Sequence, residues 1–203
     1  MVMLVLKMIL VVVIAYLLGS IPTGYLIVKK LKGIDIRQTG SGSTGATNVK
    51  RVLGTKWFFT VMILDALKGA LAVLIAVKYF NFIACLGLSP VLAAIAVIIG
   101  HSKSIFLGFT GGKSVATGVG TILALCWPVG LIIAAIWGII TYLSKYVSLG
   151  SVIAISMAPV LMTIFDQNVY YICFAALGAI YVVLMHKENI KRLIAGTENK
   201  VRK

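Results

Sequence analysis

Acidic residues are scarce in this sequence. Its 203 residues include only five Asp and Glu against 19 Lys and Arg, which gives a formal net charge of +14. The five acids are scattered along the chain, at Asp35, Asp65, Asp166, Glu188 and Glu198. A carboxylate-bound cation such as Mg²⁺ needs acidic side chains that converge on one point. We therefore expect no metal site and no other cofactor.

Cysteine is equally rare, with three residues at Cys85, Cys126 and Cys173. They are far apart in the sequence, odd in number and surrounded by apolar residues. Such a pattern indicates neither a disulfide framework nor a metal site. We expect all three to be small core residues.

Charged residues of both signs make up only 12% of the sequence, whereas hydrophobic residues make up 61% and the mean hydropathy is +1.07. A water-soluble domain needs a polar surface around its core, so this composition excludes one. A membrane-spanning helix needs about 20 mainly apolar residues, and six such runs occur. They lie at about residues 3–28, 57–80, 82–100, 127–145, 149–165 and 168–185.

A seventh apolar run, at about residues 114–125, is short and contains several Gly and Thr residues, so we expect a partial or buried helix there. No small-residue cleavage site interrupts the first run, which we expect to remain as the first span. The sequence therefore predicts an all-α integral membrane protein of about seven transmembrane helices, one of them short, in a single domain over residues 1–203.

The basic residues are predicted to lie mostly on one side of the membrane. Sixteen of the 19 Lys and Arg residues fall between alternate spans or in the C-terminal tail. The positive-inside rule then places the long loop after the first span and the C-terminus in the cytoplasm, and the N-terminus outside. These charges are dispersed without interleaved aromatic residues, which argues against a nucleic acid as partner. Membrane lipids and an anionic substrate explain them better.

A polar, glycine-rich segment at residues 40–54 interrupts the apolar sequence. Its glycines and interleaved hydroxyl groups can direct several N–H and O–H donors into one concavity, and Lys50 and Arg51 add positive charge. We expect this segment to bind a phosphate. Its candidate ligands are Ser41, Gly42, Gly45, Thr47, Asn48 and Arg51.

A second glycine-rich segment, at residues 100–118, offers the candidates Gly111, Gly112, Lys113 and Ser114. It is not a Walker A loop, because Leu107 stands where the first glycine would be and no strand precedes it. Flexible glycines, a Lys charge and a helix N-terminus expected near Ser114 nevertheless favour an anion. Close helix packing through Gly108 and Gly112 is the alternative.

Two pairs of polar residues lie at or within the spans. After the last span, a helix over residues 186–198 would place His186 and Asn189 on one face, although His186 is equally explained as an interfacial polar residue. Asp65 and Lys68 share a face inside a span, where ionisable side chains are candidates for function. We expect this pair to support phosphate binding, with Lys68 at the substrate site; a structural ion pair is the alternative. His101 is expected to be structural.

The three cytoplasmic segments together resemble the signature motifs of the bacterial acyl-phosphate:glycerol-3-phosphate acyltransferases. The matching residues are Gly40-Ser41-Gly42, Gly45-Ala46-Thr47-Asn48 and Arg51, then Gly111-Gly112-Lys113 and Val115-Ala116-Thr117, then His186, Asn189-Ile190, Arg192-Leu193, Gly196 and Glu198. The resemblance covers essentially the whole chain in order and spacing. It implies seven spans, a bacterial cytoplasmic (inner) membrane, an N-terminus outside and a cytoplasmic active site.

The resemblance implies that a fatty acyl group passes from acyl-phosphate to the 1-hydroxyl of glycerol 3-phosphate. The products would be lysophosphatidic acid and inorganic phosphate, at the first acylation of phospholipid synthesis. Catalytic roles are implied for Ser41, Arg51, Lys113, His186 and Asn189. Binding roles are implied for the glycines and hydroxyl groups of the first two segments, and Glu198 is expected to be structural.

The residues agree with this chemistry. An acyl phosphate has a good leaving group, so the enzyme mainly needs to orient a hydroxyl and offset the charge of two phosphates. Neither histidine is followed five residues later by Asp, so the His-x-x-x-x-Asp acyltransferase pair is absent from the sequence. The proton acceptor is then His186 or the departing phosphate. A membrane transporter of phosphate or of a phosphorylated metabolite is the alternative function, although transporters usually bind at the midplane.

Three departures from the family pattern concern Ser43, where Asn is usual, Ser114, where Gly is usual, and residues 102–104, where an aromatic-Pro segment is typical. If the backbone at Ser114 has positive φ, a side chain there costs about 1 kcal/mol. The second loop is then shaped differently from that of its relatives.

Overall fold

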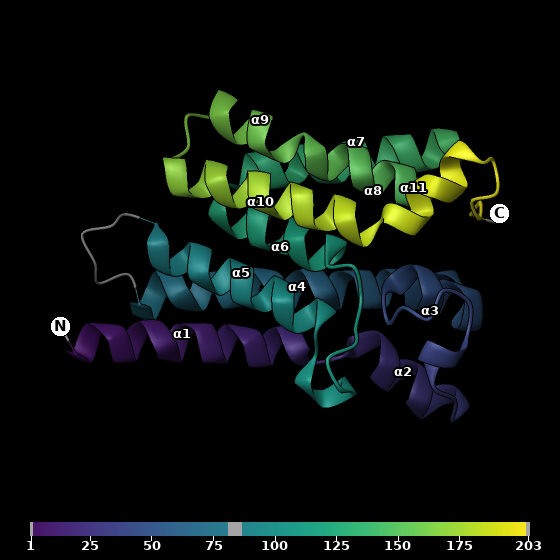
Figure 1. Ribbon diagram of the computed structural model, residues 1–203, viewed down its shortest axis with the longest axis horizontal. Helices are drawn as coiled ribbons and strands as arrows, with labels where there is room; N and C mark the ends of the chain where they lie inside the picture. Colours follow the sequence, from purple (N-terminus) through teal and green to yellow (C-terminus); the bar gives the residue numbers. More distant parts are fainter. Residues whose placement is uncertain (1, 81–86, 202–203) are drawn as a thin grey trace. The chain divides into compact units, whose positions relative to one another are not determined.

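The computed structural model describes residues 2–80 and 87–201 of the chain, and within them it is helical with no strand (Figure 1). One isolated β-bridge pairs Ser104 with Thr110. The chain divides into two compact units, residues 1–121 and 122–203, and the boundary falls within α6 (Val115–Leu125). The predicted all-α class is confirmed.

Three long helices form the frame of the first unit: α1 (Val2–Ser20), α4 (Thr55–Phe80) and α5 (Leu88–Ser102). All three pack against one another, and their shared core consists largely of Ala and Val. Gly19 of α1 lies against the Val97 carbonyl of α5, and Gly100 lies against the Tyr16 carbonyl of α1. Such small residues let two backbones approach closely, which is how helices associate where no water is present to drive them together.

The first helical run breaks after Ser20. Pro22 lacks an N–H donor, so the helix restarts as α2 (Thr23–Lys32), which ends at Gly33 in the left-handed conformation. The 3₁₀ helix η1 (Ile36–Gln38) and α3 (Ala46–Leu53) follow. A small apolar core joins α2, η1, α3 and the start of α4 through Val28, Ile36, Val49 and Val61. This core supports the first glycine-rich segment.

The second unit contains α7 (Trp127–Ser144), α8 (Val147–Ser156), α9 (Ala158–Ile164), α10 (Val169–Met185) and α11 (Lys187–Ile194). The break between α8 and α9 precedes Pro159, which cannot donate to the helix ladder. A bend of 62° separates α10 from α11. His186 lies at this bend, and Lys145 lies between α7 and α8.

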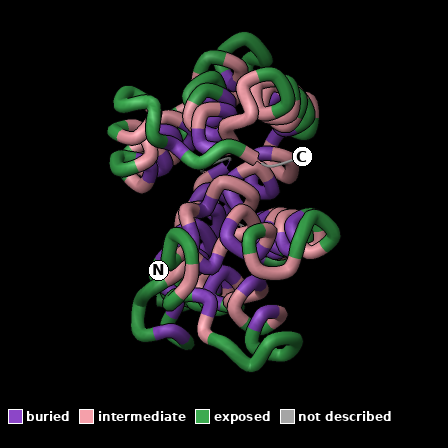
Figure 2. The backbone as a smooth tube through the Cα atoms, turned by 90° about the vertical axis from the view of Figure 1, so that its right-hand side faces the viewer, coloured by how far each residue is buried: buried purple, intermediate pink, exposed green. Residues whose placement is uncertain are grey.

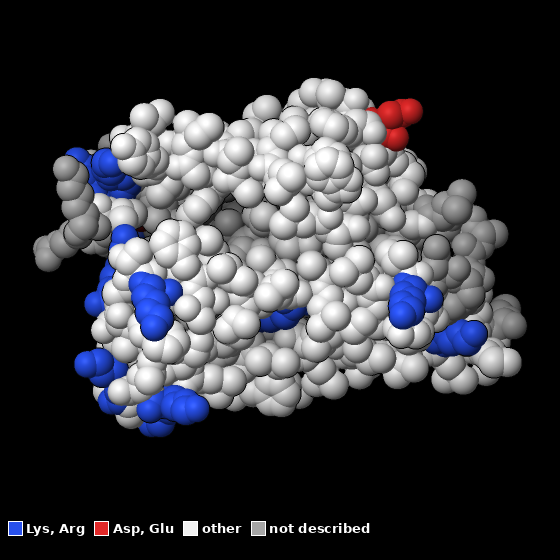
Figure 3. Space-filling view, turned by 180° about the vertical axis from the view of Figure 1, so that it is seen from behind, with Lys and Arg blue, Asp and Glu red and all other residues white. Residues whose placement is uncertain are grey.

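The outer faces of both units are apolar. Buried residues lie between the helices and exposed ones on their outer sides (Figure 2). Large exposed hydrophobic residues recur along the long helices, for example Leu6, Leu71, Leu131 and Leu177. In the first unit, the Lys and Arg side chains visible in Figure 3 gather mainly toward one end of the helices. This distribution is expected of helices surrounded by lipid tails, with charges kept at the headgroups.

Within the described residues, four helical runs are long and apolar enough to cross a membrane, or five if the bent pair α10 and α11 counts as one span. These four are residues 2–32, 55–80, 127–144 and 147–164. Each matches a predicted span within a few residues. The total of seven spans and the orientation of the termini stay predictions.

Two predicted runs form short helices, of which the first is shorter than expected and the second is as short as predicted. The run at 82–100 contains the 15-residue α5 (Leu88–Ser102), and its first residues, with Cys85, lie outside the described part of the chain. The run at 114–125 is the 11-residue helix α6, as the short length predicts. Cys126 is buried as expected, but the core placement of Cys173 is wrong, because this side chain is exposed on the outer face of α10. A thiol is apolar enough to face lipid, so burial in protein is not required.

Candidate active site

The side chain of Asn48 shapes the first glycine-rich loop from inside. Its amide nitrogen donates to the carbonyls of Ile36 at 3.2 Å, Thr39 at 2.9 Å and Ser43 at 2.9 Å. Its oxygen accepts a hydrogen bond from the Ser41 backbone N–H at 3.2 Å. Asn48 is 1% exposed, so its polar atoms serve the loop itself. These contacts hold the backbone of the loop in place, and the substrate-binding role that the sequence predicts for Asn48 stays a prediction.

The other candidates of this loop lie around that buried amide. Ser41 and Gly42 are exposed, and Gly42 has φ of 69°, which glycine adopts without strain. Gly45 is the residue before α3, and Thr47 lies half-buried in the first turn of that helix. Arg51 is exposed on α3, with its side chain close to Gly40, and within residues 2–80 and 87–201 it makes no ion pair. The loop therefore offers a hydroxyl and a guanidinium group at its surface.

The second glycine-rich loop packs directly on His101. The Gly112 N–H donates to the His101 carbonyl at 3.1 Å. A Cβ on Gly111 would collide with that same carbonyl, and a Cβ on Gly112 would collide with His101 Nε2. Lys113 follows, half-buried, at the loop's exit. Gly111 and Gly112 are thus needed for close approach.

Ser114 ends this loop in the left-handed region, with φ of 60°. It is buried, and its hydroxyl donates to the Ile98 carbonyl at 2.9 Å. Helix α6 begins at the next residue, Val115, as predicted from the sequence. Ser114 thus has the positive φ that its departure from glycine made a concern. Its side chain strains the backbone at a position where glycine would not.

A buried polar cluster lies behind the second loop. Lys68 Nζ is 3.0 Å from Asp65 Oδ1 and donates to the Ile21 carbonyl at 2.8 Å, at the break of the first helical run. Thr23 donates its hydroxyl proton to Asp65. The Nδ1 atom of His101 lies 3.6 Å from Asp65 Oδ1, longer than a hydrogen bond. The predicted Asp65–Lys68 pair is present, and Lys68 is held by protein groups.

In the second unit, Glu198 gathers three donors. Its Oε1 accepts from Ser148 Oγ at 2.9 Å and from Asn189 Nδ2 at 2.7 Å, and its Oε2 accepts from Arg192 Nε at 2.7 Å. Burial alone would raise the pKa of Glu198, but the hydrogen bonds from Asn189, Arg192 and Ser148 outweigh it and lower that pKa. The carboxylate thus fixes one face of α11.

His186 is buried at the bend between α10 and α11. Its Nδ1 lies 2.8 Å from the Val182 carbonyl. A carbonyl oxygen only accepts, so in the neutral imidazole Nδ1 carries the proton and Nε2 the lone pair. The structure therefore places His186 and Asn189 in one unit and the two glycine-rich loops in the other.

No group of three or more His, Cys, Asp or Glu side chains that could hold a metal ion occurs in the part of the chain that the structure describes. Sequence reasoning overlooked the packing of Gly112 on His101 and the hydrogen bonds of Arg37 to Asp35 and Leu107. Only the adjacent Gly111-Gly112 pair and the short Asp35-x-Arg37 spacing hint at them.

Comparison with known proteins agrees with this architecture. The sequence profile of the family described as Glycerol-3-phosphate acyltransferase matches residues 9–196. A Glycerol-3-phosphate acyltransferase of Trichormus variabilis is 50% identical over 94% of this chain and 90% of its own length.

Two crystal structures of PlsY (YgiH), described as an integral membrane glycerol 3-phosphate acyltransferase, share the fold at 38% sequence identity. The glycerol 3-phosphate form has a TM-score of 0.89 and covers 96% of both chains. The lysophosphatidic acid form has a TM-score of 0.87 and covers 96% of this chain and 95% of its own. The chain belongs to the glycerol-3-phosphate acyltransferase family.

Proposed function

We propose that this membrane acyltransferase takes its acyl group from an acyl-phosphate and passes it to the 1-hydroxyl of glycerol 3-phosphate. The products are lysophosphatidic acid and inorganic phosphate. The observation that carries the acceptor is the close match, over nearly the whole chain, to a glycerol 3-phosphate form and a lysophosphatidic acid form of a relative. The donor is supported by the chemistry of the loops, which offer groups for two phosphates.

In this reaction the acceptor hydroxyl oxygen attacks the acyl carbonyl, and the bond from that carbon to the phosphate oxygen breaks. The hydroxyl proton leaves, and the phosphate departs with the electron pair of the broken bond. Catalysis then depends mainly on orienting the hydroxyl and on offsetting negative charge. Basic side chains and N–H donors on fixed loops supply both.

We assign phosphate contacts to Ser41 and Arg51, which are exposed on a loop held by buried Asn48. Lys113 is assigned to the phosphate of glycerol 3-phosphate, with Gly111 and Gly112 allowing close approach of the backbone. His186 and Asn189 are assigned to catalysis. The network around Glu198 supports the last assignment, because it orients the Asn189 amide.

The proton acceptor is either His186 Nε2 or the departing phosphate. The pH dependence of kcat/KM for His186→Gln separates the two. Loss of a limb near the ordinary histidine pKa is expected if His186 is the base. An unchanged profile with a lower rate assigns the proton to phosphate.

We also propose that the protein lies in a bacterial cytoplasmic membrane with its glycine-rich loops on the cytoplasmic side. The bias of Lys and Arg supports this orientation. Labelling of single cysteines introduced at the exposed positions Ser41 and Lys78, in intact cells with an impermeant reagent, tests it. Position 78 reacting and position 41 staying protected is the expected result.

The function itself is tested with purified protein, a long-chain acyl-phosphate and glycerol 3-phosphate. Release of phosphate together with lysophosphatidic acid is expected. Acyl-CoA or an acylated acyl carrier protein in place of acyl-phosphate should give no lysophosphatidic acid. Product from the thioesters but not from acyl-phosphate would overturn the donor assignment.

A further inference from the structure

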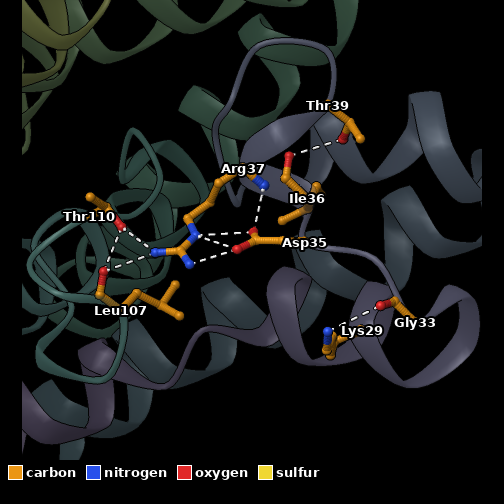
Figure 4. A network of polar contacts seen from close by, with 8 residues as sticks. All are labelled: Lys29, Gly33, Asp35, Ile36, Arg37, Thr39, Leu107 and Thr110. Atoms are coloured by element: carbon orange, nitrogen blue, oxygen red, sulfur yellow. Dashed lines mark hydrogen bonds and ion pairs between the residues drawn. The ribbon is translucent and has the colours of Figure 1, made fainter.

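Arg37 joins two segments of the chain that the sequence separates by about 70 residues (Figure 4). On one side its Nη2 and Nε contact Asp35, at 2.6 Å to Oδ2 and 3.0 Å to Oδ1. On the other side its Nη1 donates to the Leu107 carbonyl at 3.2 Å and to Thr110 Oγ1 at 3.3 Å. The guanidinium also lies over the Tyr25 ring, 5.5 Å from its centroid. One planar group therefore serves four partners.

The turn that Arg37 contacts is conformationally demanding. Gly108 and Phe109 both have positive φ, 62° and 61°, and a bulky residue such as Phe109 adopts this region at a cost. The turn is held by Ser104, whose carbonyl accepts from Phe109 N–H at 2.8 Å, and by the Thr110 hydroxyl, which donates to the Leu107 carbonyl at 2.8 Å. Gly111, Gly112 and Lys113 follow immediately. The start of the second loop is thus fixed where Arg37 binds.

The backbone of Arg37 is tied just as closely to the first loop. The adjacent Ile36 carbonyl accepts from the Asn48 amide at 3.2 Å. Gly42 passes over the Arg37 carbonyl, which would lie 3.3 Å from a Cβ on Gly42. The Arg37 N–H in turn donates to Asp35 Oδ1 at 2.9 Å. The side chain reaches one glycine-rich loop while the main chain supports the other.

We propose that Arg37 is a positioning residue that holds the two glycine-rich loops in register, so that their phosphate-binding groups act together. This role rests on the proposed function, because it presumes that both loops bind phosphate groups. Asp35 orients the guanidinium by occupying its Nε and Nη2 edge, which leaves Nη1 for the turn. Lysine cannot replace it, since a single ammonium cannot reach both sides in one geometry.

The charge state of the pair fits this role. The hydrogen bonds from the Arg37 side chain lower the pKa of Asp35, and Asp35 raises the pKa of Arg37. Both groups are therefore charged at neutral pH. The side chains of Arg37 and Asp35 are 36% and 19% exposed, so the ion pair by itself stabilises the fold little. Loss of the Arg37–Asp35 ion pair is therefore expected to lower the catalytic rate more than the stability.

The test uses full-length enzyme with Arg37→Ala, Arg37→Lys and the control Lys29→Ala, whose exposed ammonium donates to the nearby Gly33 carbonyl at 3.1 Å. A displaced loop lowers kcat/KM about 10-fold to 100-fold. We expect this loss for both Arg37 variants and none for Lys29→Ala, with Tm changed by less than about 4 °C. Added guanidinium ion should restore part of the activity of Arg37→Ala, and ammonium ion should not.

Wild-type activity in Arg37→Ala, full activity in Arg37→Lys, or a lost activity that guanidinium does not restore while Tm falls steeply, would each overturn the proposal. These outcomes are separate from failure of the proposed function. In that case the unaltered enzyme itself would form no lysophosphatidic acid from acyl-phosphate.

Discussion

Gly112 lies against the imidazole of His101, so closely that a Cβ at position 112 would overlap His101 Nε2. His101 in turn faces Asp65 inside the first unit, 3.6 Å from its carboxylate. The second glycine-rich loop therefore packs on the His101 side chain, and the neighbouring Asp65 limits how far that side chain can move. Glycine at this position is a packing requirement as well as a source of flexibility.

Gly112→Ala is expected to lower kcat/KM for glycerol 3-phosphate at least tenfold, because the methyl group lifts the loop from His101 and displaces Lys113. Gly118→Ala is the matched control, since the nearest atom that its Cβ would meet among the described residues is Ile98 Cδ1, at an ordinary 3.9 Å. Steady-state kinetics with varied glycerol 3-phosphate checks both variants. Equal activity of Gly112→Ala and Gly118→Ala would contradict the conclusion that the loop needs close packing of Gly112 on His101.

Asn48→Asp is expected to be more harmful than Asn48→Ala. The carboxylate would set oxygen atoms against the three carbonyls that the amide now serves, whereas alanine leaves room for water. We expect Asn48→Asp to lose about 2 kcal/mol of stability or more, together with most of the activity. Thermal unfolding in detergent and the acyltransferase assay measure the two effects.

Gln38→Glu introduces the same charge change on the exposed neighbouring 3₁₀ helix and serves as control for Asn48→Asp. It should leave both stability and activity near the wild-type values. If Asn48→Ala proves as damaging as Asn48→Asp, the amide acts through direct contact with substrate rather than through the loop carbonyls.

Ser114→Ala and Ser114→Gly should differ in stability although both lose the hydroxyl bond to the Ile98 carbonyl. Glycine relieves the left-handed backbone, worth about 1 kcal/mol, and so offsets the lost hydrogen bond. Alanine keeps the strain. Unfolding free energies in mixed micelles should place Ser114→Gly near wild type and Ser114→Ala about 1 kcal/mol below it; the reverse order would show that the backbone at 114 carries no strain.

Glu198→Gln is expected to destabilise the protein at neutral pH by about 1–3 kcal/mol, because charged hydrogen bonds to Arg192 and Asn189 are lost. The folded state lowers the pKa of Glu198 below its ordinary value of 4.5. The carboxylate therefore contributes its stability above pH 4.5, and this contribution is lost as the pH falls through the depressed pKa.

The difference in Tm between wild type and Glu198→Gln should accordingly shrink as the pH is lowered from 7 toward 3. Glu188→Gln, on α11, is the control, since the ion pair of Glu188 with Lys191 is largely exposed and stabilises little. A pH-independent difference for Glu198→Gln would indicate lost packing instead of lost charge.

The amino-acid sequence by itself determined the helical membrane class and the positions of the polar segments. Runs such as residues 57–80 must be helical because lipid offers the backbone no hydrogen-bond partner, and that constraint acts on each run locally. The same local logic predicted the start of α6 after Ser114. The order and spacing of the three polar motifs along the chain indicated the acyltransferase family.

Tertiary structure decided what the individual candidates contact. Whether Asn48 faces a ligand or three loop carbonyls depends on Ile36 and Thr39 being folded back over it, and the seat of Gly112 depends on α5. Arg37 has Leu107 and Thr110 as hydrogen-bond partners because the fold brings the turn at residues 107–110 next to it. Spacing in the sequence cannot encode such contacts, because they arise from which backbone segments pack together, and a polar side chain buried there must bond to whatever groups it meets.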